Sequence, residues 1–229
     1  MNALITGASK GIGKAIAVEF AKNGYNVAIC ARNEHHLAEV ALILKDYGVA
    51  VIAKKVDCSV KDEVIAFADE VMKKFEQLDV LINNLGIFTP GSLLDEADEV
   101  FELQQQVNVN AAYYFAKRAG KLMRKQRSGH IFNICSIASK TPVANAGSYS
   151  VTKAAMLSLN HVLRMELATH NVKVTAVVPG STLTASWEGT TIASEKFVQP
   201  TDIAKLIMHI LSLSSGVNVD ELILTPIDF

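Results

Sequence analysis

A glycine-rich turn near the start of the chain limits the possible folds more than any other feature. Residues 3–6 form a short apolar run, Gly7-Ala8-Ser9-Lys10-Gly11-Ile12-Gly13 follows, and Ile12, Ile16 and Phe20 then recur at every fourth position. This order predicts a strand, a loop and a helix. Such a unit presents backbone N–H groups and the positive end of a helix dipole to a phosphate. The spacing is GxxxGxG, unlike the common GxGxxG fingerprint, and a tight turn without a ligand would need the same glycines.

The alternation of apolar runs with helical stripes continues along the chain. Further strands are predicted at residues 27–31, 49–56, 78–82, 131–135, 172–178 and 221–225. Between the fourth and fifth of the seven strands, residues 96–126 are interpreted as one long helix or a helix pair. Seven strands separated by helices predict an α/β, doubly wound Rossmann fold, with a seven-stranded parallel sheet and helices on both faces. The length of 229 residues fits a single domain over 1–229.

Composition excludes several classes of partner. The net charge of −1 gives no general attraction to nucleic acid or to an anionic membrane, and no apolar run approaches the ~20 residues of a membrane helix. Neither the three cysteines (Cys30, Cys58 and Cys135) nor the six histidines show metal-ligand spacing, so no metal is expected and the cysteines are interpreted as buried small hydrophobes. An odd cysteine count without a targeting segment predicts a reducing, cytoplasmic location.

Small and polar residues collect where the predicted strands end. In a doubly wound sheet the ligand crevice lies outside these carboxyl ends. Arg32 ends the second strand, where an NAD site usually has a carboxylate, and a guanidinium there suits a 2′-phosphate. Lys10 adds a second positive group. Together they favour NADP(H) over NAD(H), although two ordinary surface cations would look the same.

Other polar residues at these positions leave alternatives open. Asp57 either accepts a hydrogen bond from an adenine amino group or caps the following helix. Asn83 and Asn84 either tie neighbouring strand tips together or form a polar turn. Asn108 stands in an apolar part of the 96–126 helix, where asparagine is a mediocre helix former. It either satisfies a local backbone group or holds a water in a site.

Tyr149 and Lys153 are four residues apart, which places them on one face of a helix. An ammonium beside a phenol favours the phenolate and lowers the phenol pKa towards the working range of a proton carrier. An exposed tyrosine and lysine on a solvated helix is the alternative. Further along, the polar stretch 184–199, which contains Trp187, lacks periodicity and fits a lid.

Over essentially its full length the chain resembles the short-chain dehydrogenase/reductase family. The resemblance rests on motifs in the family's order, and Tyr149 stands 13 positions after Ser136. These motifs are Thr6 to Gly13, Asp57, Asn83-Asn84-Leu85-Gly86, Asn108, Ser136, Tyr149-x-x-x-Lys153, and Pro179-Gly180 with Thr184.

The resemblance implies a role for each position. Tyr149 would exchange a proton with the substrate oxygen, Ser136 would hydrogen-bond that oxygen, and Lys153 would lower the pKa of Tyr149 and bind the nicotinamide ribose. Asn108 would hold a water that links Lys153 to solvent. The implied cofactor contacts are Gly7, Ser9, Gly11, Ile12 and Gly13 along the pyrophosphate and adenosine, Asp57 and Cys58 at adenine, Asn84 and Gly86 along the ribose, and Pro179, Gly180, Thr182 and Thr184 at the nicotinamide end. Lys10 with Arg32 resembles the NADPH-preferring subgroup.

Two departures affect the expected substrate. Leu85 stands where the family usually has alanine, which would crowd the cofactor channel slightly. Residues 219–226 lack the glycine-rich ending common in 3-oxoacyl-acyl-carrier-protein reductases and look more like members that reduce hydroxy or oxo acids and small carbonyls. The resemblance therefore implies an NADP(H)-dependent oxidoreductase acting on a carbonyl or secondary alcohol, either a 3-oxoacyl thioester or a small ketone, and usually a homotetramer or homodimer. A non-catalytic NADP(H)-binding sensor or scaffold is the alternative.

Overall fold

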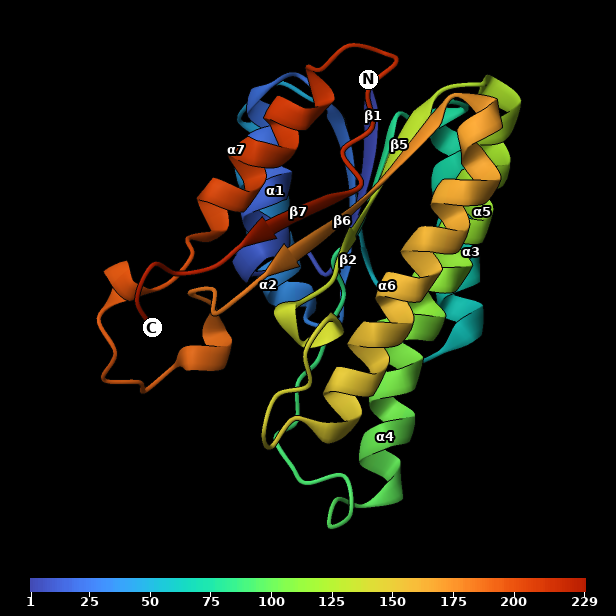
Figure 1. Cartoon of the computed structure of the whole chain (residues 1–229). Coiled ribbons are helices and arrows are strands. Elements are labelled where there is room, and N and C mark those ends of the chain that lie inside the picture. Colours follow the sequence, from blue (N-terminus) through green and yellow to red (C-terminus); the bar gives the residue numbers. More distant parts are fainter.

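The computed structural model describes residues 1–229 and has three layers, with a parallel sheet between two layers of helices (Figure 1). The strand order in the seven-stranded sheet is β3-β2-β1-β4-β5-β6-β7, and every neighbouring pair is parallel. The predicted single-domain Rossmann fold is confirmed. The strands are β1 (Asn2–Thr6), β2 (Asn26–Ala31), β3 (Val51–Lys55), β4 (Val80–Asn83), β5 (Gly129–Ile134), β6 (Val172–Pro179) and β7 (Glu221–Leu224).

The helices divide between the two faces of the sheet. They are α1 (Gly11–Lys22), α2 (Glu34–Lys45), α3 (Lys61–Phe75), α4 (Asp98–Gln104), α5 (Ala111–Gln126), α6 (Gly147–Leu167) and α7 (Pro200–Leu211). α1, α2 and α7 cover one face, while α3, α5 and α6 cover the other (Figure 1). Because consecutive strand side chains point to opposite faces, Val27 and Ile29 of β2 pack towards α1, whereas Ala28 and Cys30 pack towards α3 and α5.

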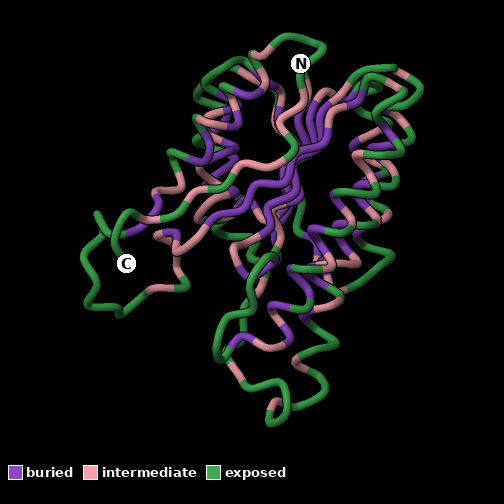
Figure 2. Tube along the Cα trace, in the orientation of Figure 1, coloured by how far each residue is buried: buried purple, intermediate pink, exposed green.

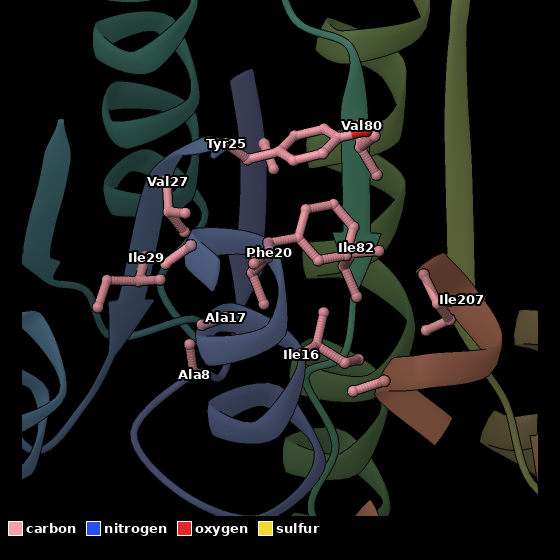
Figure 3. Packing of buried hydrophobic residues seen from close by; sticks show 14 of the residues in the cluster. Ala8, Ile16, Ala17, Phe20, Tyr25, Val27, Ile29, Val80, Ile82 and Ile207 are labelled. Atoms are coloured by element: carbon pink, nitrogen blue, oxygen red, sulfur yellow. The ribbon is translucent and has the colours of Figure 1, made fainter. Parts of the chain in front are cut away.

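Two apolar cores fill the spaces between the sheet and its helices. Figure 3 shows Ile16 and Phe20 of α1 facing Ile82 of β4, with Ile207 of α7 beside them. All four side chains are fully buried. Figure 2 shows that buried positions follow the strands, while exposed positions lie in the loops at both ends of the sheet and on the outer sides of the helices. The rigid core therefore holds the strand ends, and the loops beyond them are free to differ in sequence.

The predicted helix over 96–126 is continuous but not uniform. Between α4 and α5, residues Gln105–Asn110 form a π-helical segment, whose turns are wider than those of an α-helix. Asn108 is fully buried within it. π segments of this kind are frequent at functional sites because they re-aim side chains. The amide that looked misplaced in a regular helix thus sits at an irregular turn.

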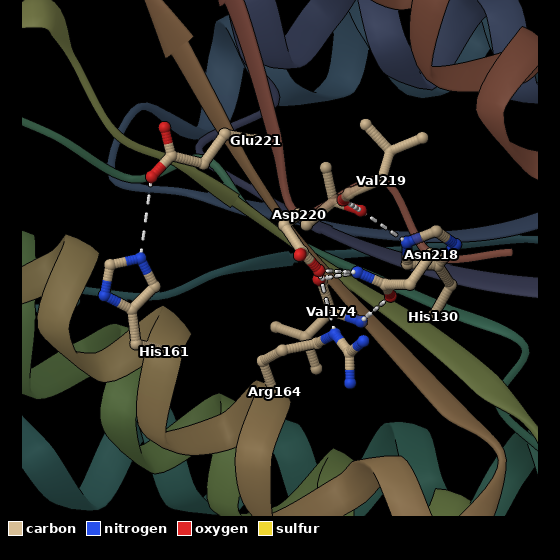
Figure 4. Close-up of polar contacts among 9 residues, drawn as sticks. His130, His161, Arg164, Val174, Asn218, Val219, Asp220 and Glu221 are labelled. Carbon is tan, nitrogen blue, oxygen red and sulfur yellow. Dashed lines mark hydrogen bonds and ion pairs between the residues drawn. The ribbon is translucent and has the colours of Figure 1, made fainter.

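The edge strand β7 is fixed to β6 and α6 by side chains (Figure 4). Asn218 forms two 3.0 Å bonds with the backbone of Val174, one in each direction. Arg164 Nε of α6 donates to Asp220 Oδ1 at 3.0 Å. These contacts hold residues 218–220 against β6 and α6, and so place β7 at the edge of the sheet.

Two other findings concern the whole chain. The three cysteines are free and buried, as their apolar surroundings predict. No helix combines the length and the apolar character needed to cross a membrane.

Candidate active site

The strand order reverses between β1 and β4, and a cleft of about 670 Å³ opens at the carboxyl ends of the strands there. Every candidate residue from the sequence lines this cleft except Gly13, Asp57 and Asn108. The lining candidates are Gly7, Ser9, Lys10, Gly11, Ile12, Arg32, Cys58, Asn84, Gly86, Ser136, Tyr149, Lys153, Pro179, Gly180, Thr182 and Thr184.

The glycine loop connects β1 to α1 in a conformation that needs glycine. Gly7 has φ +66°, in the left-handed region. A Cβ at Gly13 would lie 2.4 Å from both the Gly7 carbonyl oxygen and Asn84 Nδ2, so Gly13 serves the packing of the loop rather than lining the cleft. No side chain caps the start of α1. The N–H groups of its first turn are therefore available to an anion in the cleft.

Asn84 ties the tips of β1 and β4 together. Its Nδ2 donates to the carbonyl oxygens of Thr6 at 3.0 Å and Gly7 at 3.1 Å. Asn83 Nδ2 similarly donates to Asn133 Oδ1 of β5 at 2.9 Å. Of the two alternatives for this amide pair, the structure shows the tie between strand tips.

Positive charge lies at the glycine-loop end of the cleft. Lys10 and Arg32 are exposed there, and neither forms an ion pair. Asp57 is close enough to Arg32 to interact with its charge, but its Oδ1 accepts from the Ser59 hydroxyl at 2.7 Å and the Ser59 N–H at 3.0 Å. The two bonds from Ser59, helped by Arg32, hold the pKa of Asp57 below its ordinary value. Asp57 thus caps the turn before α3, whose own N-cap is Val60.

Lys153 is buried, unlike the lysine of an exposed helix pair. Its side chain is on α6, the residue is 3% exposed, and Nζ donates to the Ile134 carbonyl oxygen at 3.0 Å. Nζ lies 5.7 Å from the centroid of the Tyr149 ring. An ammonium has three N–H donors, so two remain for other partners. Folding thus keeps a positive charge next to the phenol in a largely dry position, where charges interact more strongly than in water.

Ser136 begins a short 3₁₀ turn, Ile137–Ser139, just after β5. Its Oγ accepts from the Ala138 N–H at 3.2 Å, and its backbone N–H donates to Ser139 Oγ at 3.1 Å. In the first bond Oγ is the acceptor, and in the second the backbone N–H is the donor. The hydroxyl hydrogen remains free to donate to a ligand in the cleft.

Asn108 lies behind the cleft and holds the segment that follows β4. Its Oδ1 accepts from the Ile87 N–H at 2.8 Å, and its Nδ2 donates to the Ile87 carbonyl oxygen at 3.1 Å and to Thr152 Oγ1 at 3.0 Å. Asn108 thus satisfies a backbone group, as one alternative predicts, but this group belongs to Ile87, 21 residues away, and is not local. A Cβ on Gly86 would come 3.3 Å from Lys153 Nζ and 3.9 Å from Asn108 Oδ1. The absence of a side chain at Gly86 thus keeps the space beside the Lys153 ammonium open.

None of the individual apolar residues that lie around Tyr149 was predicted from the sequence. The Phe88 ring meets the Tyr149 ring edge to face, with centroids 5.1 Å apart and an interplanar angle of 71°. Ile137, Val143 and Ala146 line the same cleft. They lie in loops without periodicity, so their only signal in the sequence is the presence of apolar residues in segments expected to be exposed.

The segment 184–199 is held against the C-terminal residues. Trp187 lines the cleft and packs edge to face on Phe197 and Phe229, with ring centroids 5.1 Å and 5.4 Å away. Two short 3₁₀ turns, Ala185–Trp187 and Ser194–Lys196, give the segment local structure. A separate cavity of about 380 Å³ between residues 195–198 and 224–228 contains none of the candidate residues. The candidates therefore define one site.

The family follows from comparison with known proteins. Residues 1–194 match the model of the short chain dehydrogenase family. The chain belongs to this family, and it is an oxidoreductase.

Relatives match over nearly the whole chain. An uncharacterized oxidoreductase of Staphylococcus saprophyticus is 35% identical over 226 residues, which cover 98% of this chain and 97% of the relative. An alcohol dehydrogenase from the archaeon Thermococcus sibiricus, complexed with 5-hydroxy-NADP, superposes with a TM-score of 0.90 at 28% identity, covering 99% of this chain and 96% of that chain. L-sorbose reductase from Gluconobacter frateurii, complexed with NADPH and L-sorbose, has a TM-score of 0.90 at 29% identity, with 98% and 94% covered.

Proposed function

We propose that the protein, acting as one unit over residues 1–229, is an NADP(H)-dependent oxidoreductase that interconverts a carbonyl compound and a secondary alcohol. One observation carries the proposal. Tyr149, the buried Lys153 and Ser136 line the same cleft as the glycine loop, and no side chain caps the helix α1 that follows this loop. The short-chain dehydrogenase family supports the reaction class.

The residues around the glycine loop fit a dinucleotide. Gly7 has a left-handed backbone, Gly13 leaves no room for a Cβ, and the N–H groups of α1 can face a pyrophosphate. Lys10 and Arg32, free of ion pairs, suit the 2′-phosphate of NADP(H) better than the 2′-hydroxyl of NAD(H). Structural neighbours solved with NADPH or an NADP derivative support this preference.

Further residues of the cleft would complete the cofactor site, and a bound nicotinamide would supply or accept the hydride at its inner end. Cys58 would meet the adenine, with Asp57 supporting the turn that presents it. The remaining proposed contacts are Ser9, Gly11 and Ile12 on the phosphate side, Asn84 and Gly86 along the ribose, and Pro179, Gly180, Thr182 and Thr184 at the nicotinamide end.

Proton transfer is assigned to Tyr149. During reduction Tyr149 gives its proton to the substrate oxygen, and Ser136 donates a hydrogen bond to the same oxygen and fixes its position. The ammonium of Lys153 stabilises the phenolate that Tyr149 becomes. Asn108 would complete the proton route from Lys153 towards solvent. Since both Nδ2 donors of Asn108 are used, a water there would bind its backbone carbonyl or the remaining lone pair of Oδ1.

Replacing the phenol tests the proposed chemistry. Tyr149→Phe keeps the ring against Phe88 and removes only the hydroxyl, so we expect at least a 1,000-fold loss of kcat with an NADPH dissociation constant within about threefold of the wild type. A panel of ketones, aldehydes and acyl thioesters provides the substrate. Wild-type turnover in the variant would exclude Tyr149 as the proton donor. Tight NADPH binding without turnover of any compound would favour a sensor or scaffold.

Replacing Arg32 tests the cofactor preference. We expect Arg32→Asp to weaken NADPH binding by about 10- to 100-fold, since a charge-assisted hydrogen bond contributes about 1.5–3 kcal/mol. NADH binding should change little or improve. Calorimetric titration measures both, and Arg124→Asp, a change on the last turn of α5, serves as the control. Equal affinity for NADH and NADPH in the wild type would contradict the preference.

We also propose that the protein forms a homodimer or homotetramer through the helices that carry the site. Large apolar side chains are exposed on α5 and α6, among them Tyr113, Val151, Val162 and Met165, which is 72% exposed. Sedimentation velocity measures the state, and a monomer at micromolar concentration would refute this assembly. The three free cysteines fit a reducing compartment such as the cytoplasm, and cell fractionation tests that location.

A further inference from the structure

We propose that the substrate is an uncharged, apolar ketone, and that Phe88, with the apolar residues that adjoin Tyr149, recognises its hydrocarbon group. This inference rests on the proposed function, because it names the substrate of the same site. It selects among the carbonyl compounds that the family as a whole can reduce.

The wall beside Tyr149 is apolar. Phe88 meets the Tyr149 ring directly, and Ile137, Val143 and Ala146 line the cleft from the segment between β5 and α6, where the Val143 N–H donates to Ser150 Oγ of α6 at 3.3 Å. Phe88 and Val143 are each 48% exposed. Covering exposed apolar side chains with a hydrocarbon group removes both from water, which lowers the free energy and favours binding.

Apart from Lys153, the charged residues of the cleft lie at its glycine-loop end. The only charged residues among its lining are Lys10, Arg32 and Lys153, and no carboxylate lines it. Lys10 and Arg32 belong to the glycine-loop end, and Lys153 is held by Ile134 beneath Tyr149. The cation nearest to the Phe88 wall is Lys153, which already donates to the Ile134 carbonyl and is assigned to Tyr149. The carboxylate of an oxo acid bound against this wall would therefore lack a cation of its own, which is unfavourable.

Polar partners for a polyhydroxylated substrate are also few. Ser136 and Tyr149 are assigned to the reacting oxygen. Of the polar side chains on residues 181–186, Thr182 Oγ1 already donates to the Gly180 carbonyl, and Thr184 Oγ1 accepts from the Ser186 N–H, which leaves the hydroxyl groups of Ser181 and Ser186 and the hydroxyl hydrogen of Thr184. A sugar, whose several hydroxyl groups each need partners, would therefore find only these few side chains, none of them on the Phe88 wall.

The wall is fixed in place. Phe88 lies between Ile87, which Asn108 holds by two bonds, and Gly91, whose N–H donates to the Asn145 carbonyl at 2.9 Å. The Gly147 N–H donates back to Gly91 at 3.3 Å. A loop anchored on both sides presents its aromatic ring at a defined distance from Tyr149, as selection of one substrate class requires.

A matched pair of ketones separates charge from shape. Methyl benzoylformate and benzoylformate share the aryl ketone and differ by a neutral ester against a carboxylate. With NADPH at about pH 7, we expect kcat/KM to be at least 100-fold higher for the ester. Acetophenone should also exceed hydroxyacetone and L-sorbose. A carboxylate or sugar among the best substrates would overturn the inference while leaving the proposed reaction standing.

Binding can be read without turnover, because Trp187 is the only tryptophan and lines the cleft. In the NADPH complex of Tyr149→Phe, tryptophan fluorescence should report a dissociation constant at least tenfold lower for the ester than for the anion. If this preference appears while the wild type reduces no ketone, the proposed reaction fails and the ligand class stands. Equal binding, or no binding of either compound, would overturn the ligand class.

Three variants locate the preference. Phe88→Ala should raise KM for acetophenone about tenfold and change kcat for hydroxyacetone less than threefold, whereas a role only in orienting Tyr149 would lower kcat for both. Tyr47→Ala removes another half-exposed aromatic ring, far from the cleft, and should change neither. Val143→Lys places a cation on the wall and should raise the benzoylformate-to-ester ratio of kcat/KM at least tenfold. An unchanged ratio would place the recognising wall elsewhere and refute the role of this face.

Discussion

His130 of β5 should make the fold sensitive to mild acid. The residue is 3% exposed, and its ring stacks on Phe132 with centroids 3.9 Å apart. Its Nε2 lies 2.8 Å from Thr175 Oγ1, which itself donates to the Val219 carbonyl at 2.6 Å. Since the threonine has one hydrogen and gives it to Val219, it must accept from the histidine. The neutral tautomer with a proton on Nε2 therefore fits this network.

The size of the effect follows from the pKa. Burial, together with the positive charge of Lys173, lowers the pKa of His130 from 6.5 to about 3. Between these values the unfolded chain binds a proton that the folded chain does not. The contribution of His130 is thus complete above pH 6.5 and is lost as the pH falls towards 3, with a slope of about 1.4 kcal/mol per pH unit. At pH 5 the loss is about 2 kcal/mol, or roughly 4–8 °C in Tm for a chain of this size.

The assay compares pH dependences instead of absolute stabilities. His130→Gln can still donate to Thr175 but cannot titrate. Urea unfolding from pH 7.5 to 4.5 should give the variant a slope shallower than that of the wild type by about one proton. Carboxylates with lowered pKa values, such as Asp220 and Glu221, contribute equally to both proteins and cancel. His35→Asn, at an exposed position on α2, should keep the wild-type slope. Parallel curves for wild type and His130→Gln would show that His130 does not titrate abnormally and would refute the reasoning.

Two further predictions concern the residues that shape the cleft. Gly13→Ala should destabilise the fold by about 1–3 kcal/mol and weaken NADPH binding, because its Cβ would overlap the glycine loop and Asn84. The control is Gly216→Ala, which has open space around it and should leave the denaturation curve and the NADPH titration unchanged. Asn108→Ala should cost about 1–3 kcal/mol by leaving the Ile87 backbone without its partners, and it should lower kcat more than it raises the NADPH dissociation constant. A wild-type melting curve for either site variant would contradict the packing described.

The sequence predicted the fold because periodicity and strand ends carry most of its information. Each of the seven predicted strands overlaps an observed one, and the errors are at the ends, as at β5, which starts at Gly129 instead of Ile131. Those end residues pair in the sheet without adding to an apolar run. The π-helical turn at Asn108 could not be read from spacing, since it depends on the bonds of Asn108 to Ile87 and Thr152, far away in the sequence.

The reactive residues could be predicted from the sequence, whereas the apolar wall beside Tyr149 could not. Ser136 follows a hydrogen-bonded strand within two residues and Tyr149 stands in the first turn of a helix, so regular structure carries both to the cleft. Phe88 reaches Tyr149 only because Asn108 and Asn145 hold its loop from other parts of the chain. Apolar residues in a loop have no period that distinguishes a binding wall from an exposed surface.

The substrate specificity of such a chain can change without any movement of its reactive residues. The loops around Phe88 and Val143 are attached to the reactive core through a few backbone hydrogen bonds, so their side chains can change while Tyr149, Lys153 and Ser136 keep their places. The same argument explains why relatives with TM-scores of 0.90 at less than 30% identity include both an alcohol dehydrogenase and a sugar reductase. We therefore infer that the side chains beside Tyr149 determine which substrate this chain accepts, and these side chains are apolar.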